Sequence, residues 1–313
     1  MTRPPLETLR KYRADYSPDT DFSAFGRLLQ SIWREKKLLP LADGKLGNFL
    51  PNEFAKETRA NYLTDNIKTL VQYEVLKARN DGKLISEPRI WNNLLSSQPL
   101  CFNLFGEFHF DLKLASKYFH KLFPDRVKEV TSVQFEYSPG RGNENFTGDH
   151  SAFDVFVEYK NLTDKLGFIG IEVKYAESLK DDKEKTRHTF SKRGKRYLEI
   201  ANESKLFPEL SLEKLKEVPL QQIWRDHLLA LSLVQSKTMN YEEGFFVYLF
   251  PSKNDQCQIA VDTYIEHLAT VDESKNIFYP RHLDLFIKTL RQMNSADWTL
   301  ELQERYLGEQ LTY

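Results

Sequence analysis

The chain has 313 residues, of which 41% are hydrophobic and 28% charged, and its 44 Lys and Arg against 45 Asp and Glu leave a net charge of −1. This composition excludes a disordered or fibrous chain, and the charge excludes a uniformly basic nucleic-acid binder but not a local basic face. Two cysteines are too few for a zinc cluster or a disulfide framework. No run approaches ~18 apolar residues and no apolar segment follows the N-terminus, so we expect a cytoplasmic protein without a membrane span.

Apolar residues recur at helical spacing in three segments of the first part of the chain. The spacing predicts helices over residues 21–37, 60–79 and 111–122. We therefore expect a helical N-terminal accessory region over residues 1–105, followed by a second domain over residues 106–313.

The pattern changes from a period of 3.6 to a period of two after the third helix. Alternation predicts strands over residues 130–137, 152–159 and 167–175. An amphipathic helix over 220–235 and a continuous apolar strand over 244–250 follow, so the predicted order is α-β-β-β-α-β. The remaining predicted elements are a short strand near 257–261 and helices near 281–293 and 297–306.

Three acidic residues and a lysine lie on these predicted strands, and their register follows from the positions of the turns. In an antiparallel pair, opposed residues lie on the same face of the sheet. A turn centred at residues 163–164 brings Asp154 opposite Glu172 and Lys174. A turn in the Gly- and Asn-rich loop around residue 145 brings Glu136 opposite Asp154. One meander therefore places these four side chains on one face of adjacent strands.

Carboxylates that converge on one face repel each other unless a cation lies between them. Oxygen ligands suit Mg²⁺ or Mn²⁺, which bind through one or two carboxylates together with substrate phosphate. Lys174 would orient or deprotonate the attacking water, or stabilise the pentacovalent phosphate. The alternative is a structural ion-pair cluster, because the bare pattern Asp/Glu-x-Lys recurs at surface positions such as Glu35/Lys37 and Glu158/Lys160.

The stretch from Phe153-Asp154 to Glu172-Val-Lys174, in this order of elements, resembles the PD-(D/E)XK nuclease superfamily. Segments 96–105, 135–139 and 222–229 are similar to a bacterial branch described as restriction-endonuclease-like. The resemblance spans about residues 90–250. It implies an α/β restriction-endonuclease-like core, with a mixed central sheet flanked by helices and a helical N-terminal addition.

The same resemblance implies that Asp154 and Glu172 bind the divalent metal and that Lys174 is catalytic, with the backbone carbonyl of Val173 as a candidate third ligand. The chain departs from the family pattern at Phe153, which stands where the superfamily's name has proline. Many members supply a further glutamate from the first core helix, whereas this chain offers Glu136 on the first strand as a candidate extra ligand or supporting group. A Gln-x-x-x-Tyr pair found in some members is also not reproduced, because Arg225 follows Gln221 at that spacing, although Gln222 and Arg225 could still face phosphate.

Residues 180–197 carry eight Lys and Arg against three acidic residues. Because this segment directly follows the catalytic strand, it could track a phosphate backbone. The candidates are Lys192, Arg193, Lys195 and Arg196. The alternative is a solvated loop, which is how most charge runs behave.

These observations predict a Mg²⁺- or Mn²⁺-dependent nuclease, and more specifically a DNA endonuclease with a restriction or defence role. One alternative is a catalytically silent nuclease fold that binds protein or nucleic acid, and another is a metal-dependent hydrolase of a small phosphoester. A homodimer is compatible with the resemblance, since double-strand cleavage by such cores often needs two active sites.

Overall fold

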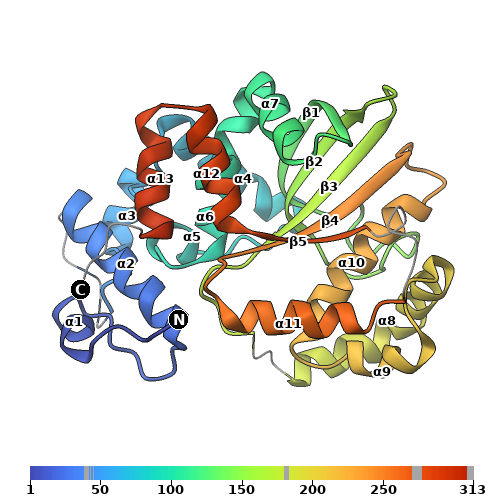
Figure 1. Ribbon diagram of the computed structural model, residues 1–313, viewed down its shortest axis with the longest axis horizontal. Coiled ribbons are helices and arrows are strands. Elements are labelled where there is room, and N and C mark those ends of the chain that lie inside the picture. The colour runs from blue at the N-terminus through green and yellow to red at the C-terminus, as the bar shows by residue number, and fades with distance from the viewer. Residues whose placement is uncertain (39–41, 43, 45, 180–182, 270–276, 309–313) are drawn as a thin grey trace.

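A computed structural model describes residues 1–38, 42, 44, 46–179, 183–269 and 277–308, without the side chains of residues 79 and 183–191. The chain forms a central sheet covered by helices on both faces (Figure 1). The α/β fold class and the flanked mixed sheet predicted from the sequence are confirmed.

The sheet has five strands in the order β1-β2-β3-β4-β5. The first three form an antiparallel meander, and β4 and β5 then add to β3 in parallel. The strands are β1 (Val127–Tyr137), β2 (Phe153–Asn161), β3 (Leu166–Val173), β4 (Glu243–Phe250) and β5 (Phe278–His282).

The register of the meander agrees with the turn positions predicted from the sequence. Val155 pairs with Ile171 across β2 and β3, and with Phe135 across β1 and β2. Continuing both ladders by one residue sets Asp154 opposite Glu172 and Glu136. The predicted register is therefore confirmed, because both turns are centred where the sequence placed them.

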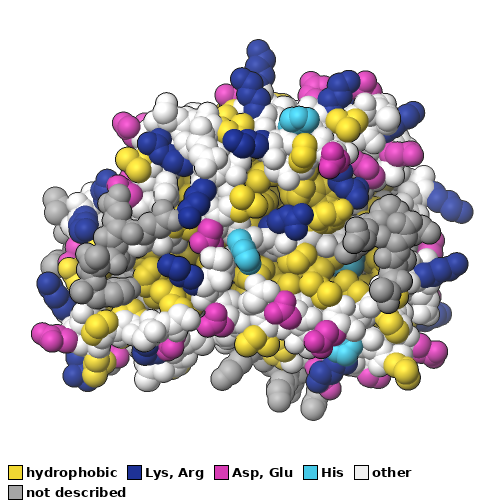
Figure 2. Space-filling model, viewed as in Figure 1, with side chains coloured by type: hydrophobic (Ala, Val, Ile, Leu, Met, Phe, Trp, Pro, Cys, Tyr) yellow, Lys and Arg dark blue, Asp and Glu magenta, His cyan; other side chains and the backbone are white. Residues whose placement is uncertain are grey.

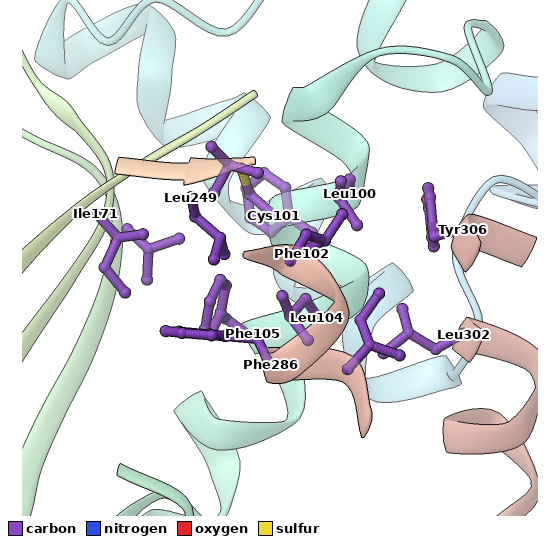
Figure 3. Close-up of a cluster of buried hydrophobic side chains, with 14 of the residues drawn as sticks. Leu100, Cys101, Phe102, Leu104, Phe105, Ile171, Leu249, Phe286, Leu302 and Tyr306 are labelled. Atoms are coloured by element: carbon purple, nitrogen blue, oxygen red, sulfur yellow. The ribbon is translucent and has the colours of Figure 1, made fainter. Parts of the chain in front are cut away.

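One face of the sheet is covered by helices from both ends of the chain. Its core is built around α6, whose apolar side chains lie between Ile171 and Leu249 of the sheet and Phe286 and Leu302 of the C-terminal helices (Figure 3). The helices contributing to this core are α2 (Asp21–Lys37), α3 (Asn52–Thr58), α4 (Asp65–Asp81), α5 (Arg89–Asn92), α6 (Ser97–Phe110), α7 (Leu112–Leu122), α12 (Leu283–Met293) and α13 (Asp297–Leu307), and the short helix α1 (Leu6–Lys11) lies in the N-terminal region.

The opposite face is covered by helices from the middle of the chain, which lie below the sheet in Figure 1. Aromatic side chains of β2, β3 and β4, including Phe156, Phe168 and Phe246, belong there to a second core that also contains Trp224 of α10. The covering helices are α8 (Lys183–Ser204), α9 (Leu212–Leu215) after a 3₁₀ turn at Glu209–Ser211, α10 (Leu220–Gln235) and α11 (Asp255–Glu266).

One predicted element is wrong. The strand expected near 257–261 lies in α11, where Cys257, Ala260, Val261 and Tyr264 are buried at helical spacing. The five residues 257–261 are too few to show the helical period, which becomes clear only over the whole of α11. The predicted helix over 60–79 also begins later, at Asp65, because Thr64 caps it by accepting a hydrogen bond from Ile67 N.

The boundary predicted between residues 105 and 106 lies within α6, and a division into residues 1–105 and 106–313 stays a prediction. No described helix is both long enough and apolar enough to cross a membrane. In Figure 2 basic and acidic side chains are interspersed over the visible face, with hydrophobic side chains showing across the middle.

Candidate active site

Asp154 lies at the start of β2 and Glu172 at the end of β3, at one edge of the sheet. Their apolar neighbours Val155, Ile171 and Val173 point into the core around α6, so the alternation of a strand sends both carboxylates to the opposite face. Asp154 Oδ2 accepts a hydrogen bond from Val173 N at 2.7 Å. This bond fixes the Asp154 carboxylate against the backbone beside Glu172.

Lys174 joins Glu172 and a glutamine of α10 in a closed triangle of hydrogen bonds. Its ammonium donates to Glu172 Oε1 at 2.7 Å and to Gln222 Oε1 at 3.0 Å. Gln222 Nε2 in turn donates to the same Glu172 oxygen at 2.7 Å. Only 12% of the Lys174 side chain and 8% of the Glu172 side chain are exposed, so this ion pair is largely desolvated.

Glu136 is held at the end of β1 by groups from two other segments. Its backbone has a φ of 49°, which is uncommon for a residue with a side chain. Gln98 of α6 donates from Nε2 to Glu136 Oε1, and Arg141 donates to the Glu136 carbonyl. The pairing register brings Glu136 to the same edge of the sheet as Asp154.

Burial, and after it the repulsion between carboxylates, disfavours the charged form of the acidic groups at this edge. Burial raises the pKa of Asp154 well above its ordinary value, and Glu172 and Glu136 raise it further. Burial also raises the pKa of Glu136 to about 7, where the hydrogen bond from Gln98 opposes the shift and Glu172 adds to it. Burial alone would lower the pKa of Lys174, but Glu172 and Asp154 raise it above its ordinary value.

The donor set fits a hard divalent cation of the Mg²⁺ type. Every available donor is oxygen, and a cation would relieve the repulsion that raises the carboxylate pKa values. Asp154 and Glu172 supply two carboxylates, which is the number such an ion commonly takes from protein while keeping several waters. Over the described ranges, no three His, Cys, Asp or Glu side chains converge as a ready-made metal site.

Asp226 is a site residue that the sequence analysis missed. It lies one turn after Gln222 on α10, is 4% exposed, and its Oδ2 has no hydrogen-bond partner in the described part of the chain. Burial raises its pKa well above the ordinary value, and Glu172 adds to the shift. The i, i+4 spacing of Gln222 and Asp226 was the signal available, since it puts both on one helix face.

Arg225, which the sequence analysis weighed as a phosphate contact, binds the loop between β1 and β2 instead. It donates to Ser151 Oγ at 3.2 Å and lies 3.7 Å from Asp149 Oδ2. The Asp149 carboxylate also accepts hydrogen bonds from Thr147 and Tyr197. This network fastens the loop to α8 and α10 at the side of the site.

The four basic residues singled out in the segment 180–197 lie on α8 and divide into two pairs. Arg196 donates to the carbonyls of Phe146 and Asn145, and Arg193 lies 3.4 Å from Glu144, so both hold the β1–β2 loop. Lys192 and Lys195 are exposed. The side chains of residues 180–191, where the rest of the basic excess falls, lie outside the described residues.

Comparison with known proteins gives one family. The family model that describes the PD-(D/E)XK nuclease superfamily matches residues 17–308. No curated protein and no solved structure gives a match. The matched range includes the five strands of the sheet together with Asp154, Glu172, Lys174 and Gln222. The chain belongs to the PD-(D/E)XK nuclease superfamily.

Proposed function

We propose that the chain is a divalent-metal-dependent nuclease that cleaves DNA internally. The observation that carries this proposal is the buried triangle of Lys174, Glu172 and Gln222 beside Asp154, at an edge of the sheet where acidic side chains are in excess. A purely structural ion pair between Lys174 and Glu172 would need neither Asp154 nor Glu136 beside it.

Asp154 and Glu172 would hold the metal, with the Val173 carbonyl as a candidate third ligand and Glu136 as an extra ligand or supporting group. A bound divalent ion supplies Lewis-acid stabilisation of the phosphate and lowers the pKa of water. Lys174 would donate hydrogen bonds to a phosphate oxygen or to the attacking water. In the metal-free site, Glu172 and Asp154 raise the pKa of Lys174, which keeps the ammonium protonated for this donor role.

The test is cleavage of circular single-stranded DNA, circular double-stranded DNA and RNA with Mg²⁺, with Mn²⁺ or with EDTA. The variants are Lys174→Ala and Asp154→Asn, and the matched control is Lys160→Ala. Lys160 has the same Glu-x-Lys spacing on β2, but its side chain is 42% exposed and pairs with Glu129.

We expect metal-dependent cleavage of a circle by the wild type and by Lys160→Ala, and its loss in both site variants. Cleavage that survives Lys174→Ala would contradict the assignment of the site. A folded wild type that binds metal but cleaves no polymer would favour a small phosphoester as substrate. A wild type that neither cleaves nor binds metal would favour a catalytically silent nuclease fold that binds protein or nucleic acid.

A further inference from the structure

Arg141 lies in the loop between β1 and β2 and closes the base of this loop beside the acidic edge. Its Nη2 donates to the carbonyl of Glu136 at 3.1 Å, and its Nη1 donates to the carbonyl of His150 at 3.0 Å. Glu136 stands at the end of β1, and His150 shortly precedes β2. The guanidinium therefore bridges the two points where the chain leaves the sheet and returns to it.

The loop that carries Arg141 is held in one conformation by its own hydrogen bonds. Gly142 N donates to the Asp149 carbonyl at 2.6 Å, and Gly148 N donates to the Asn143 carbonyl at 3.1 Å. Gly142 has a φ of 74°, a conformation that suits glycine. Together with the contacts of this loop to α8 and α10, these bonds fix the Arg141 guanidinium before a ligand arrives, which lowers the cost of ordering it on binding.

The charge of Arg141 is not paired with an acidic side chain. Both of its acceptors are neutral carbonyl groups, and no carboxylate of the described residues forms an ion pair with it. Other cations close by are paired: Lys83 binds Glu74 at 2.5 Å while it donates to the carbonyl of Phe135. Arg141 is thus a fixed cation whose charge remains available to an anion from outside the chain.

The remaining donor groups of Arg141 can be reached by a ligand. The two bonds use one N–H of each Nη atom, and the Nε–H makes no hydrogen bond to any described residue. Arg141 is partly exposed, and its Nε is not among the buried polar atoms that lack a partner. A guanidinium with accessible N–H groups in one plane matches the oxygens of a phosphate.

The position of Arg141 relative to the metal-binding carboxylates follows from the sheet. Glu136 is opposite Asp154 on the neighbouring strand, where opposed Cα atoms are about 4.5–5.5 Å apart. Because Arg141 binds the Glu136 carbonyl, its guanidinium lies within about 11 Å of the Asp154 Cα. Successive phosphates of a DNA strand rise by about 3.4 Å, so roughly three nucleotides cover this distance.

We propose that Arg141 binds a backbone phosphate of the substrate within about three nucleotides of the cleaved bond. This inference rests on the proposed function, because it takes a nucleic acid as the substrate. The remaining N–H groups would donate to the phosphate oxygens while the bonds to both carbonyls stay in place. Since the loop fixes the guanidinium, this contact would align the substrate strand with Asp154 and Glu172.

The experiment uses DNA oligonucleotides in which one phosphate at a time, around the cleavage point, is replaced by an uncharged methylphosphonate. It measures kcat/KM with Mg²⁺, and Kd over a salt series in EDTA. The variants are Arg141→Ala and Arg141→Lys. The matched control is Arg3→Ala, because Arg3 is also partly exposed and donates through both Nη atoms to backbone carbonyls, those of Asp19 and Tyr16.

We expect Arg141→Ala to lower kcat/KM on the unmodified strand by about 10–100-fold and the slope of log K against log salt by about 1. One methylphosphonate should lower wild-type cleavage by a similar factor and leave Arg141→Ala unaffected, because the contact is already lost. Arg141→Lys keeps the charge and should keep the salt slope of the wild type. Arg3→Ala should behave as the wild type in every arm.

Two results would overturn the contact and leave the nuclease proposal intact. One is that every methylphosphonate affects the wild type and Arg141→Ala by the same factor, and the other is an unchanged salt slope in Arg141→Ala. Either result would mean that Arg141 only closes the loop. A wild type that cleaves nothing but shows the coupling in Kd overturns the nuclease and keeps the contact, and one that neither cleaves nor binds DNA overturns both.

Discussion

Gln222 Oε1 accepts a hydrogen bond from Lys174 Nζ at 3.0 Å, across 48 residues of sequence. The amide of Gln222 also donates to the Glu172 oxygen that Lys174 binds. Because a glutamine carries a donor and an acceptor on one planar group, it can hold a cation and an anion at the same time. Gln222 is thereby the positioning residue for the Lys174 ammonium, and it fixes α10 to the end of β3.

The first prediction concerns Gln222→Leu, which removes both hydrogen bonds while keeping a side chain of similar size. We expect cleavage to fall by about 10–100-fold and the free energy of unfolding to fall by about 1–3 kcal/mol, because the buried ion pair loses two hydrogen bonds. The measurements are single-turnover cleavage and urea unfolding.

The control for Gln222→Leu is Gln258→Leu on α11, where the glutamine binds exposed Asp262. Gln222→Glu separates positioning from packing. It keeps the acceptor for Lys174 but places a second carboxylate against Glu172, so activity should stay low. Full activity in Gln222→Leu would show that Lys174 needs no support from α10.

The second prediction concerns Asp154→Asn and metal binding. Burial, Glu172 and Glu136 all raise the pKa of Asp154, so its charge is unfavourable in the metal-free fold. Asparagine keeps an oxygen acceptor for Val173 N and removes that charge. We expect the metal-free variant to be more stable than the wild type by about 1–2 kcal/mol at pH 7.

Saturating Mg²⁺ or Mn²⁺ should reverse this order. A ligand that binds only the folded state at 100 times its Kd stabilises by about 2.7 kcal/mol, and Asp154→Asn should lose most of that gain. Thermal unfolding with metal and with EDTA gives both values. Asp164→Asn, in the β2–β3 turn where Asp164 binds Lys128, is the control and should respond to metal as the wild type does. Equal metal responses in both variants would remove Asp154 from the ligand set.

The strands and their register were predictable because local pattern and turn position determine them. Alternation marks β1 and β2, and the turn between β2 and β3 has the Asn161 and Asp164 side chains that a tight turn uses. The common location of Asp154, Glu172 and Glu136 at one edge of the sheet could therefore be predicted without knowledge of tertiary contacts.

The helix over 220–235 was predicted with its observed bounds, but α6 and the contacts that both helices make with the site were not predictable in the same way. α6 is buried on nearly all sides, since the polar Gln98 and Asn103 are buried together with apolar residues such as Phe102, so no exposed polar face reveals a helical period. The contacts of Gln98 with Glu136 and of Gln222 with Lys174 join segments far apart in sequence. No local signal indicates that such side chains meet, and only folding brings them together.

The third prediction concerns His227, which is fully buried on α10 with Nδ1 hydrogen-bonded to Tyr264. Burial lowers its pKa to about 3, whereas the pKa of a histidine in the unfolded chain is about 6.5. Below that value the unfolded state binds more protons, so the stability that neutral His227 contributes is lost as the pH falls from 6.5 toward 3.

We therefore expect the difference in unfolding free energy between the wild type and His227→Leu to change by about 2 kcal/mol between pH 8 and pH 5. The wild type loses stability relative to the variant as the pH falls. Urea unfolding at both pH values measures this difference, and His150→Leu, at an exposed position, is the control. A difference that stays constant with pH would mean that His227 takes up its proton as readily in the folded chain as in the unfolded chain.

The last prediction separates the two pairs of basic residues on α8. Lys192 and Lys195 are exposed, so Lys192→Ala and Lys195→Ala should leave stability unchanged and each lower the slope of log K against log salt by about 1 if they contact phosphate. Arg196 donates to the carbonyls of Phe146 and Asn145, so Arg196→Ala should lower the free energy of unfolding by about 1–2 kcal/mol. Binding to a DNA oligonucleotide over a salt series, beside urea unfolding, distinguishes the two effects. If the salt slope is the same for Lys192→Ala, Lys195→Ala and the wild type, Lys192 and Lys195 do not contact the phosphate backbone.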